Sequence, residues 1–303
     1  MNTPPSALRI LRADHLGMCF GVRDALALAH REAATQPVTV LGDLVHNETV
    51  LADLRRRGVR LEQNLDDVAT PTVLITAHGA SDRRLAEVAA RGHRLVEATC
   101  PLVHLAHRAV RSLVAEGFHP VIVGRRDHVE VRGLTEDLQA FDVVLSEADV
   151  DALTPRDRFG VAAQTTQPID RVQALVERIR RRFPAAEVRF VDTVCLPTKQ
   201  RQNAAEQLAR TADVIVVIGG AHSNNTRELA NTCRQFGARV HQVLSAAELS
   251  EDWFHPGETV GVTAGTSTPQ TTIVGVERWL HALASRWTAS TAPRTRLESV
   301  ALS

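Results

Sequence analysis

Three cysteines of this sequence share one local pattern, and thiols repeated in this way could hold a metal centre. Each is followed by a helical segment, a short apolar run and a glycine, which comes 23 residues after Cys19 and 24 residues after both Cys100 and Cys195. Four residues beyond each glycine stands a polar side chain: His46, His128 and Ser223. A layout that recurs three times indicates three structural repeats.

A second polar cluster follows later in each repeat, where another apolar run ends. These clusters are TAHG with His78, AQTT with Thr165 and Thr166, and TAGTST with Ser267. In parallel sheets, ligands bind beyond the carboxyl ends of the strands, where loops enter the following helices. If the three repeats turn these ends toward one axis, the cysteines meet at a single centre ringed by polar side chains.

The cysteines favour a metal centre over a disulfide framework, because only four occur in 303 residues and no C-x-x-C pair is present. Three separated thiolates suit either a Cys₃ zinc site or an iron–sulfur cluster. Each cysteine precedes or opens a predicted helix, whose N-terminal N–H groups favour a thiolate. Cys233 lacks the repeated pattern and is expected in the core, on the apolar side of a predicted helix.

Polar residues without a full charge surround the expected centre, and they predict an anion site. Hydroxyls, amides, imidazoles and helix N-termini can bind phosphate without lysine or arginine. SNNT (223–226) and TSTP (266–269) both lead into predicted helices. Because neither G-x-G-x-x-G nor a P-loop motif occurs, we expect a phosphate or diphosphate rather than a nucleotide. An anion favours protonated histidine, so binding is expected to weaken as the pH rises.

One carboxylate lies within the expected site. HVE (128–130) places Glu130 two residues after His128, in a predicted loop at a strand end. A carboxylic acid in this place can carry a proton to or from a ligand, and we assign that role to Glu130. His104 and His107, on the helix after Cys100, are instead expected to cover that helix's surface.

Length and composition exclude several classes of protein. Hydrophobic residues make up 44% of the chain and charged residues 23%, which is typical of a globular protein rather than a disordered or fibrous one. Lys plus Arg and Asp plus Glu are 35 each, so no global field attracts nucleic acid or anionic lipid. No apolar run approaches the roughly 18 residues of a membrane span. We therefore expect a cytoplasmic protein that binds a small molecule and neither nucleic acid nor membrane.

Short β-branched runs alternate with amphipathic helices along most of the chain. Runs of strand length occur at 38–42, 72–79, 93–100, 119–124, 159–166, 188–195, 213–220 and 259–266. After Cys19, residues at helical spacing (Val22, Ala25, Leu26 and Ala29) form one apolar stripe. Alternation of this kind is typical of α/β proteins whose parallel sheets are covered by helices.

The predicted fold is therefore α/β, with three similar units of mainly parallel sheet arranged around a pseudo-threefold axis and a central cluster. The expected units are 9–97, which holds Cys19, 98–191, which holds Cys100, and 192–284, which holds Cys195. Residues 285–303 are expected to form a polar C-terminal tail.

Taken in order, the motifs resemble those of the 4-hydroxy-3-methylbut-2-enyl diphosphate reductase family, iron–sulfur enzymes of the non-mevalonate isoprenoid pathway. The resemblance covers about residues 9–283. Its motifs are GMCFGV (17–22), LVHN (44–47), TAHG (76–79), ATCPLV (98–103), HVEVRG (128–133), QTT (164–166), the Cys195 segment ending in RQ (201–202), SNNT (223–226) and TAGTSTP (263–269). QTT or TAHG alone would mean little, whereas the ordered set is highly specific.

This resemblance implies a site built around a 4Fe-4S cluster. Cys19, Cys100 and Cys195 would hold the cluster and leave one iron open. Glu130 and Thr165 would lie at the allylic hydroxyl of the substrate, with Glu130 on the proton path. The remaining implied residues would bind the substrate diphosphate: His46, His78, His128, Ser223, Asn224, Asn225 and Ser267.

The implied reaction is reductive dehydroxylation of 4-hydroxy-3-methylbut-2-enyl diphosphate. Two electrons and two protons would remove the hydroxyl as water and yield isopentenyl and dimethylallyl diphosphate. No nicotinamide-binding motif is visible in the sequence, so the resemblance implies a separate electron donor of the ferredoxin or flavodoxin type.

The sequence departs from the family pattern beside two of the cysteines. Met18 and Phe20 flank Cys19, where the family usually has an aromatic residue and a small residue. Leu196, Pro197 and Gln200 follow Cys195 and replace Tyr, Ala and Asn. These changes leave open a divergent cluster-binding paralogue with another substrate or a redox-sensing role. A Cys₃ zinc hydrolase acting on a phosphorylated compound is a third possibility.

Overall fold

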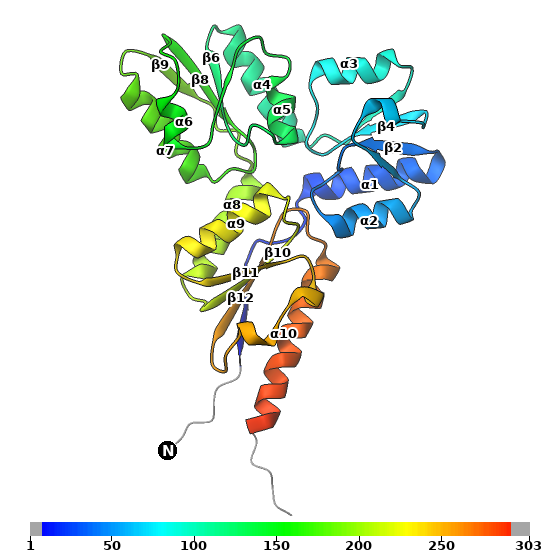
Figure 1. The fold of residues 1–303 in the computed structure, drawn as a ribbon, viewed down its shortest axis with the longest axis vertical. Coiled ribbons are helices and arrows are strands. Elements are labelled where there is room, and N and C mark those ends of the chain that lie inside the picture. Colours follow the sequence, from blue (N-terminus) through cyan, green and yellow to red (C-terminus); the bar gives the residue numbers. More distant parts are fainter. Residues whose placement is uncertain (1–7, 292–303) are drawn as a thin grey trace, which may run out of the picture.

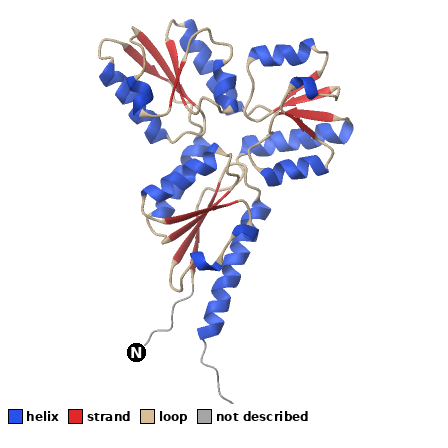
Figure 2. Cartoon of the chain, in the orientation of Figure 1, coloured by secondary structure: helices blue, strands red, loops and turns tan. Residues whose placement is uncertain are grey.

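The computed structural model describes residues 8–291. This part of the chain forms three four-stranded parallel sheets and the helices that connect their strands (Figure 1). Their strand orders are β3-β2-β4-β5, β7-β6-β8-β9 and β11-β10-β12-β1, so each sheet repeats the same winding. The three units lie around one central region, toward which the strand ends and several helix ends point (Figure 2). The predicted α/β class and the three-unit arrangement are confirmed.

The first unit begins with the helix that follows Cys19. Its elements are α1 (Phe20–Thr35), β2 (Val38–Leu41), α2 (Glu48–Arg56), β3 (Arg60–Glu62), the 3-10 helix η1 (Leu65–Asp67), β4 (Thr72–Ile75), α3 (Asp82–Ala90) and β5 (Arg94–Glu97). The predicted apolar stripe of α1 packs on the sheet, with Val22, Ala25 and Ala29 buried and Leu26 partly buried against the same core.

The second unit repeats this order from Cys100 onward. Its elements are α4 (Pro101–Ala115), β6 (His119–Val123), α5 (Val129–Thr135), β7 (Asp142–Val144), α6 (Glu147–Asp151), β8 (Arg158–Ala163), α7 (Ile169–Arg182) and β9 (Glu187–Phe190). Successive residues of β6 face opposite sides of the sheet: Val121 and Val123 pack toward α7, and Ile122 packs toward α4 and α5. Burial on both sides explains the continuous apolar runs of the central strands.

The third unit follows Cys195 and takes its last strand from the start of the chain. Its elements are α8 (Leu196–Ala209), β10 (Val214–Ile218), α9 (Asn224–Gln235), β11 (Arg239–Val243), the 3-10 helices η2 (Ala246–Glu248) and η3 (Glu251–Trp253), β12 (Thr259–Ala264), α10 (Gln270–Thr291) and β1 (Arg9–Arg12). None of the helices in residues 8–291 is long and apolar enough to cross a bilayer.

The structure differs from the predicted unit boundaries at both ends of the chain. Strand β1 pairs in parallel with β12, Ile10 opposite Val260, so residues 9–12 belong to the third sheet and not to the first unit, where 9–97 placed them. Helix α10 continues to Thr291, so residues 285–291 are helical and not part of a tail. The rest of the expected tail, 292–303, lies outside the described residues. Local periodicity does not reveal which sheet a terminal strand joins.

Because β1 belongs to the third sheet, the same connection occurs three times along the chain. The fourth strand of each sheet runs directly to a cysteine, which opens the first helix of the next unit: β1 leads to Cys19, β5 to Cys100 and β9 to Cys195. Each cysteine therefore lies on a connection between two sheets, at the carboxyl end of a strand, where parallel sheets place their ligand-binding loops.

Candidate functional site

One backbone hydrogen bond fixes each cysteine, and it is the same bond in all three units. The N–H of Cys19 donates to the carbonyl of Thr266 (3.1 Å), that of Cys100 to Ala77 (3.1 Å) and that of Cys195 to Thr165 (3.0 Å). Each acceptor stands two residues beyond the third strand of the sheet that the cysteine leaves. Each cysteine is also the N-cap residue of its helix. The three positions are therefore structurally equivalent, as the sequence repeats predicted.

The three cysteine segments also contact one another. A Cβ built on Gly21 would lie 2.5 Å from Cys100 Sγ, so the first turn of α1 passes directly against that thiol. The buried guanidinium of Arg201 joins the other two segments, because it donates to the carbonyls of Gly17 and Pro197. The cysteine segments of the three units thus lie against one another.

Burial, rather than the helix N-termini, dominates the pKa of two of the thiols, Cys100 and Cys195. It raises the pKa of Cys100, and it raises the pKa of Cys195 to about 11; nearby Cys19 adds to both shifts. Cys195 Sγ also donates to Thr198 Oγ1 (3.1 Å). Thiolates at this centre therefore require a neighbouring positive charge, which iron or zinc ions would supply.

A single-ion site and a cluster site differ in how closely they need their thiols. Within residues 8–291, no three His, Cys, Asp or Glu side chains lie close enough to hold one metal ion. A tetrahedral zinc ion needs each sulfur at about 2.3 Å, so the geometry gives the Cys₃ zinc alternative no support. A four-iron cluster binds each thiolate through a different iron and accepts more widely spaced sulfurs. Cys233 is fully buried among α8 and α9 residues, as expected for a core position.

Three histidines from two units form a second cluster. The ring centroids of His46 and His78 are 4.3 Å apart, and His128 stands edge-on to both, at 5.2 Å and 5.6 Å. Desolvation by burial lowers the pKa of all three, that of His128 to about 3, and neighbouring imidazoles lower the pKa of His78 and His128 further. At neutral pH these rings are therefore uncharged hydrogen-bond donors and acceptors.

The position of His128 fixes its tautomer. As the N-cap residue of α5, it accepts the N–H of Glu130 at Nδ1 (3.1 Å). The ring proton must then lie on Nε2, which can donate to a ligand. His46 also offers a ring atom, because its buried Nε2 has no partner in the described chain. The Nε2–H of His128 and the unpaired Nε2 of His46 are thus available to a ligand.

The third unit contributes hydroxyl and amide donors on the other side. Ser223 caps α9 by accepting the N–H of Thr226 and keeps its own O–H free to donate. Asn225 accepts the N–H of Thr266, which leaves its buried Nδ2 without a partner in residues 8–291. Ser267 donates to the carbonyl of His46 (3.2 Å), so it touches the histidine cluster directly.

Asn224 is engaged differently from its neighbours. Its Nδ2 donates to the carbonyl and hydroxyl of Thr166 (3.2 and 3.1 Å), and its Oδ1 accepts from Arg227 (3.2 Å). The side chain therefore joins the third unit to the second. Its amide is already used, unlike that of Asn225.

Glu130 and Thr165 lie between the cysteines and the histidines in this network. Glu130 is 1% exposed and its Oε1 accepts the N–H of Thr165 (2.6 Å), whose carbonyl in turn accepts from Cys195. Burial raises the pKa of Glu130 to about 7, although its bonds with Thr165 oppose the shift. The residue lies in the first turn of α5 and not in the predicted loop.

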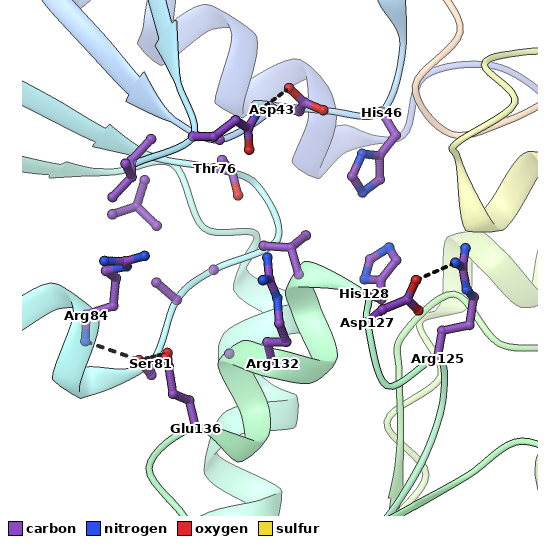
Figure 3. Close-up of a pocket in the computed structure, with 18 of the residues that line it drawn as sticks. Asp43, His46, Thr76, Ser81, Arg84, Arg125, Asp127, His128, Arg132 and Glu136 are labelled. Atoms are coloured by element: carbon purple, nitrogen blue, oxygen red, sulfur yellow. Dashed lines mark hydrogen bonds and ion pairs between the residues drawn. The ribbon is translucent and has the colours of Figure 1, made fainter. Parts of the chain in front are cut away.

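A cleft of about 390 Å³ opens from the histidine cluster between the first and second units. His46 and His128 face each other at one end of it, and Arg84 and Arg132 extend into the space (Figure 3). Arg125, paired with Asp127, stands near His128. The cleft gives a polar ligand access to the histidines.

Sequence patterns missed several residues here. His222 and Arg125 line the cleft, and Arg201 holds two cysteine segments, yet no periodicity or repeat marked them. The RQ pair at 201–202 was part of a motif but had no assigned role. His107, expected at the surface of α4, is 7% exposed and packs beneath Gly79, so that expectation was wrong.

Known proteins are similar to this chain in sequence. The LytB protein family profile matches residues 10–281. A 4-hydroxy-3-methylbut-2-enyl diphosphate reductase of Pelobacter propionicus is 37% identical over 265 residues, covering 87% of this chain and 94% of its own. The reductase of Dehalococcoides mccartyi is 35% identical over 283 residues, 92% of this chain and 99% of its own.

Two solved structures share the fold. The E-1-hydroxy-2-methyl-but-2-enyl-4-diphosphate reductase of Plasmodium falciparum superposes with a TM-score of 0.84 at 23% identity, covering 92% of this chain and 88% of its own. An (E)-4-hydroxy-3-methyl-but-2-enyl diphosphate reductase, the terminal enzyme of the non-mevalonate pathway, gives 0.66 at 32% identity and covers 91% and 99%.

Gly21→Ala tests the contact between the first turn of α1 and Cys100. The added methyl would overlap Cys100 Sγ, so we expect a loss of about 1–3 kcal/mol in the free energy of unfolding and less metal recovered with the protein. Gly275→Ala is the matched control, because nothing lies within 4 Å of a Cβ at that helical position. Denaturant unfolding and metal analysis measure both effects, and equal behaviour of the two variants would contradict the contact.

Proposed function

Because the chain belongs to the LytB protein family, we propose that it is a 4-hydroxy-3-methylbut-2-enyl diphosphate reductase. It converts this allylic alcohol diphosphate to isopentenyl and dimethylallyl diphosphate. The observation that carries the proposal is the sequence of groups from Cys195 through Thr165 to Glu130 and His128, joined by consecutive hydrogen bonds. One continuous network thus connects a thiol centre, a proton donor and an anion site.

Cys19, Cys100 and Cys195 would hold a 4Fe-4S cluster. Three thiols at equivalent positions leave the fourth iron without a protein thiolate, and the pKa values raised by burial suit thiols whose ionisation depends on bound iron. When bound, the cluster supplies electrons and a Lewis-acidic iron for the departing hydroxyl.

The diphosphate would lie against His46, His78, His128, Ser223, Asn224, Asn225 and Ser267. Support comes from the unused donors among them: the Nε2–H of His128, the Ser223 hydroxyl and the Nδ2 of Asn225. Asn224, whose amide contacts Thr166, would act chiefly by joining the second and third units around the ligand.

Glu130 would deliver a proton to the allylic hydroxyl, with Thr165 beside it. Its pKa of about 7 keeps a substantial protonated fraction at neutral pH, as a general acid requires. In the overall reaction the C–O bond breaks, two electrons and two protons are taken up, and the hydroxyl leaves as water. The helix turn that presents Glu130 also holds His128, so the diphosphate and the reacting end are positioned by one element.

Two substitutions beside the cysteines lie at exposed positions. Phe20 is 37% exposed and Leu196 is 62% exposed, and each occupies the first position of its helix. They therefore change the surface near the thiols and not the hydrogen-bonded network. This observation favours the reductase over a paralogue with another role.

Electrons would come from a separate protein of the ferredoxin or flavodoxin type. The exposed Phe20 and Leu196, next to two of the cysteines, are accessible to such a partner. We also propose a cytoplasmic enzyme, in agreement with four cysteines that are all free thiols.

Purification without oxygen tests the proposed function directly. We expect brown protein with about four iron and four sulfide per chain, and turnover of the hydroxylated diphosphate with a reduced donor. Iron and sulfide assays and product analysis provide the measurement. Zinc in place of iron, or a loaded cluster without turnover, would refute the reductase.

Glu130→Gln tests the proton donor. The substitution keeps the side-chain size but removes the acid, so we expect turnover to fall by roughly 100-fold or more with cluster content unchanged. Since the pKa of Glu130 is about 7, parent turnover should decline as the pH rises above 7, where the carboxyl loses its proton. The variant should lack this decline, and an identical profile in both proteins would exclude the role.

His128→Asn tests the anion site without removing the helix cap, because asparagine is also a favoured N-cap residue. We expect the affinity for inorganic diphosphate to fall roughly 10-fold to 100-fold, as for a hydrogen bond to a charged group. Parent affinity should also decline with rising pH, since a bound anion raises the lowered histidine pKa values and binding then takes up protons. Calorimetry in buffers of different ionisation enthalpy measures both quantities. His255→Asn, at an exposed position, is the control.

A further inference from the structure

Arg201 carries a positive charge into the interior beside the cysteines. It lies on α8 and is 7% exposed. Its guanidinium makes three hydrogen bonds, all to backbone carbonyls: Nε and Nη2 donate to Gly17 (3.1 and 2.7 Å), and Nη1 donates to Pro197 (2.9 Å). Gly17 stands two residues before Cys19, and Pro197 stands two residues after Cys195.

Within the part of the chain that the structure describes, this charge has no carboxylate counterion. Among residues 8–291, Arg201 forms no ion pair with an Asp or Glu, whereas most other arginines of the structure do. A buried charge without a counterion is costly, and carbonyl dipoles offset only part of that cost. Burial accordingly lowers the pKa of Arg201, and the negative groups that oppose the shift are Cys19 and Cys195.

We infer that Arg201 is a positioning residue for the thiolate-bound cluster. It ties the Cys19 segment to the start of the Cys195 helix, and its charge offsets the negative charge that the thiolates and the cluster bring to the centre. This inference rests on the cluster of the proposed function and goes beyond it, because it concerns the energy of cluster reduction.

The charge of Arg201 should change the reduction potential of the cluster. Reduction adds one electron from an external one-electron donor to the cluster and makes the centre more negative. A fixed positive charge in a buried, weakly screened place stabilises the reduced form more than the oxidised form. Arg201 should therefore raise the reduction potential. A purely mechanical clamp would hold the two segments together without changing the potential.

Two substitutions separate the effect of the Arg201 charge from the effect of its hydrogen bonds. Arg201→Gln removes the charge and retains a donor, and Arg201→Lys keeps the charge but loses the planar, multiple hydrogen bonds. Lys199→Gln is the matched control: it removes one positive charge from the same helix, but Lys199 is partly exposed and paired with Asp192, so water and the carboxylate screen it.

The measurement is an anaerobic redox titration of the cluster-loaded proteins, followed by absorbance and electron paramagnetic resonance, with iron and sulfide assayed in each. We expect the midpoint potential of Arg201→Gln to shift to more negative values. Arg201→Lys should remain close to the parent in potential while losing some iron. Lys199→Gln should match the parent in both.

An unchanged potential in Arg201→Gln would overturn the inference and leave a structural clamp. If Arg201→Gln cannot hold the cluster, the iron content of the two variants tests the inference instead. The inference requires Arg201→Lys to retain more iron than Arg201→Gln. An equal loss of iron in both variants would contradict it. Failure of the proposed function is recognised separately. A parent protein that holds the cluster but does not turn over the diphosphate refutes the activity, while the potentials still test Arg201.

Discussion

The site depends on one backbone hydrogen bond made three times, from each cysteine N–H to the carbonyl two residues beyond a third strand. This bond anchors the cysteine to the sheet that the chain is leaving, while its helix packs on the sheet that the chain is entering. Because the three sheets have the same winding, the thiols arrive at equivalent positions around the centre. The symmetry of the centre is thus a property of the main chain. The side chains next to two of the cysteines, Phe20 and Leu196, lie exposed at the first positions of their helices.

The proposed anion site would rely chiefly on buried, uncharged hydrogen-bond donors. Three histidine rings within 6 Å of one another cannot all be protonated in a buried place without strong repulsion, and burial already keeps them neutral. In the proposed site, neutral imidazole N–H groups, hydroxyls and helix N-termini would bind the anion, and the imidazoles would gain a proton when it arrives. Arginines stand farther out along the cleft, at positions such as Arg84 and Arg132.

In the proposed function, the same short helix turn would connect diphosphate binding to proton transfer. His128 accepts the N–H of Glu130, and the carboxylate of Glu130 accepts the N–H of Thr165. A ligand that moves His128 therefore acts on the residue that carries the acid. Burial keeps that acid partly protonated near neutral pH. Arg201, the one buried arginine of residues 8–291, joins two of the cysteine segments through their backbone carbonyls.

The sequence by itself determined the features that depend on local pattern. Repeated spacing identified the three cysteines, and polar loops after apolar runs identified the histidine, serine and asparagine positions around them. The central strands were recognisable because burial on both faces makes them continuously apolar. The strands at 9–12, 60–62, 142–144 and 239–243 were missed, since their partly exposed residues give a weaker pattern.

Only the tertiary structure decided which distant segments meet. It placed β1 in the third sheet, buried His107 under Gly79, engaged the Asn224 amide with Thr166 and set Arg201 between Gly17 and Pro197. Periodicity and spacing in the sequence indicate only which face of a segment is buried against the core of its own unit. The contacts that complete this site join residues as far apart as Gly17 and Arg201, and they arise only when three sheets pack around one axis.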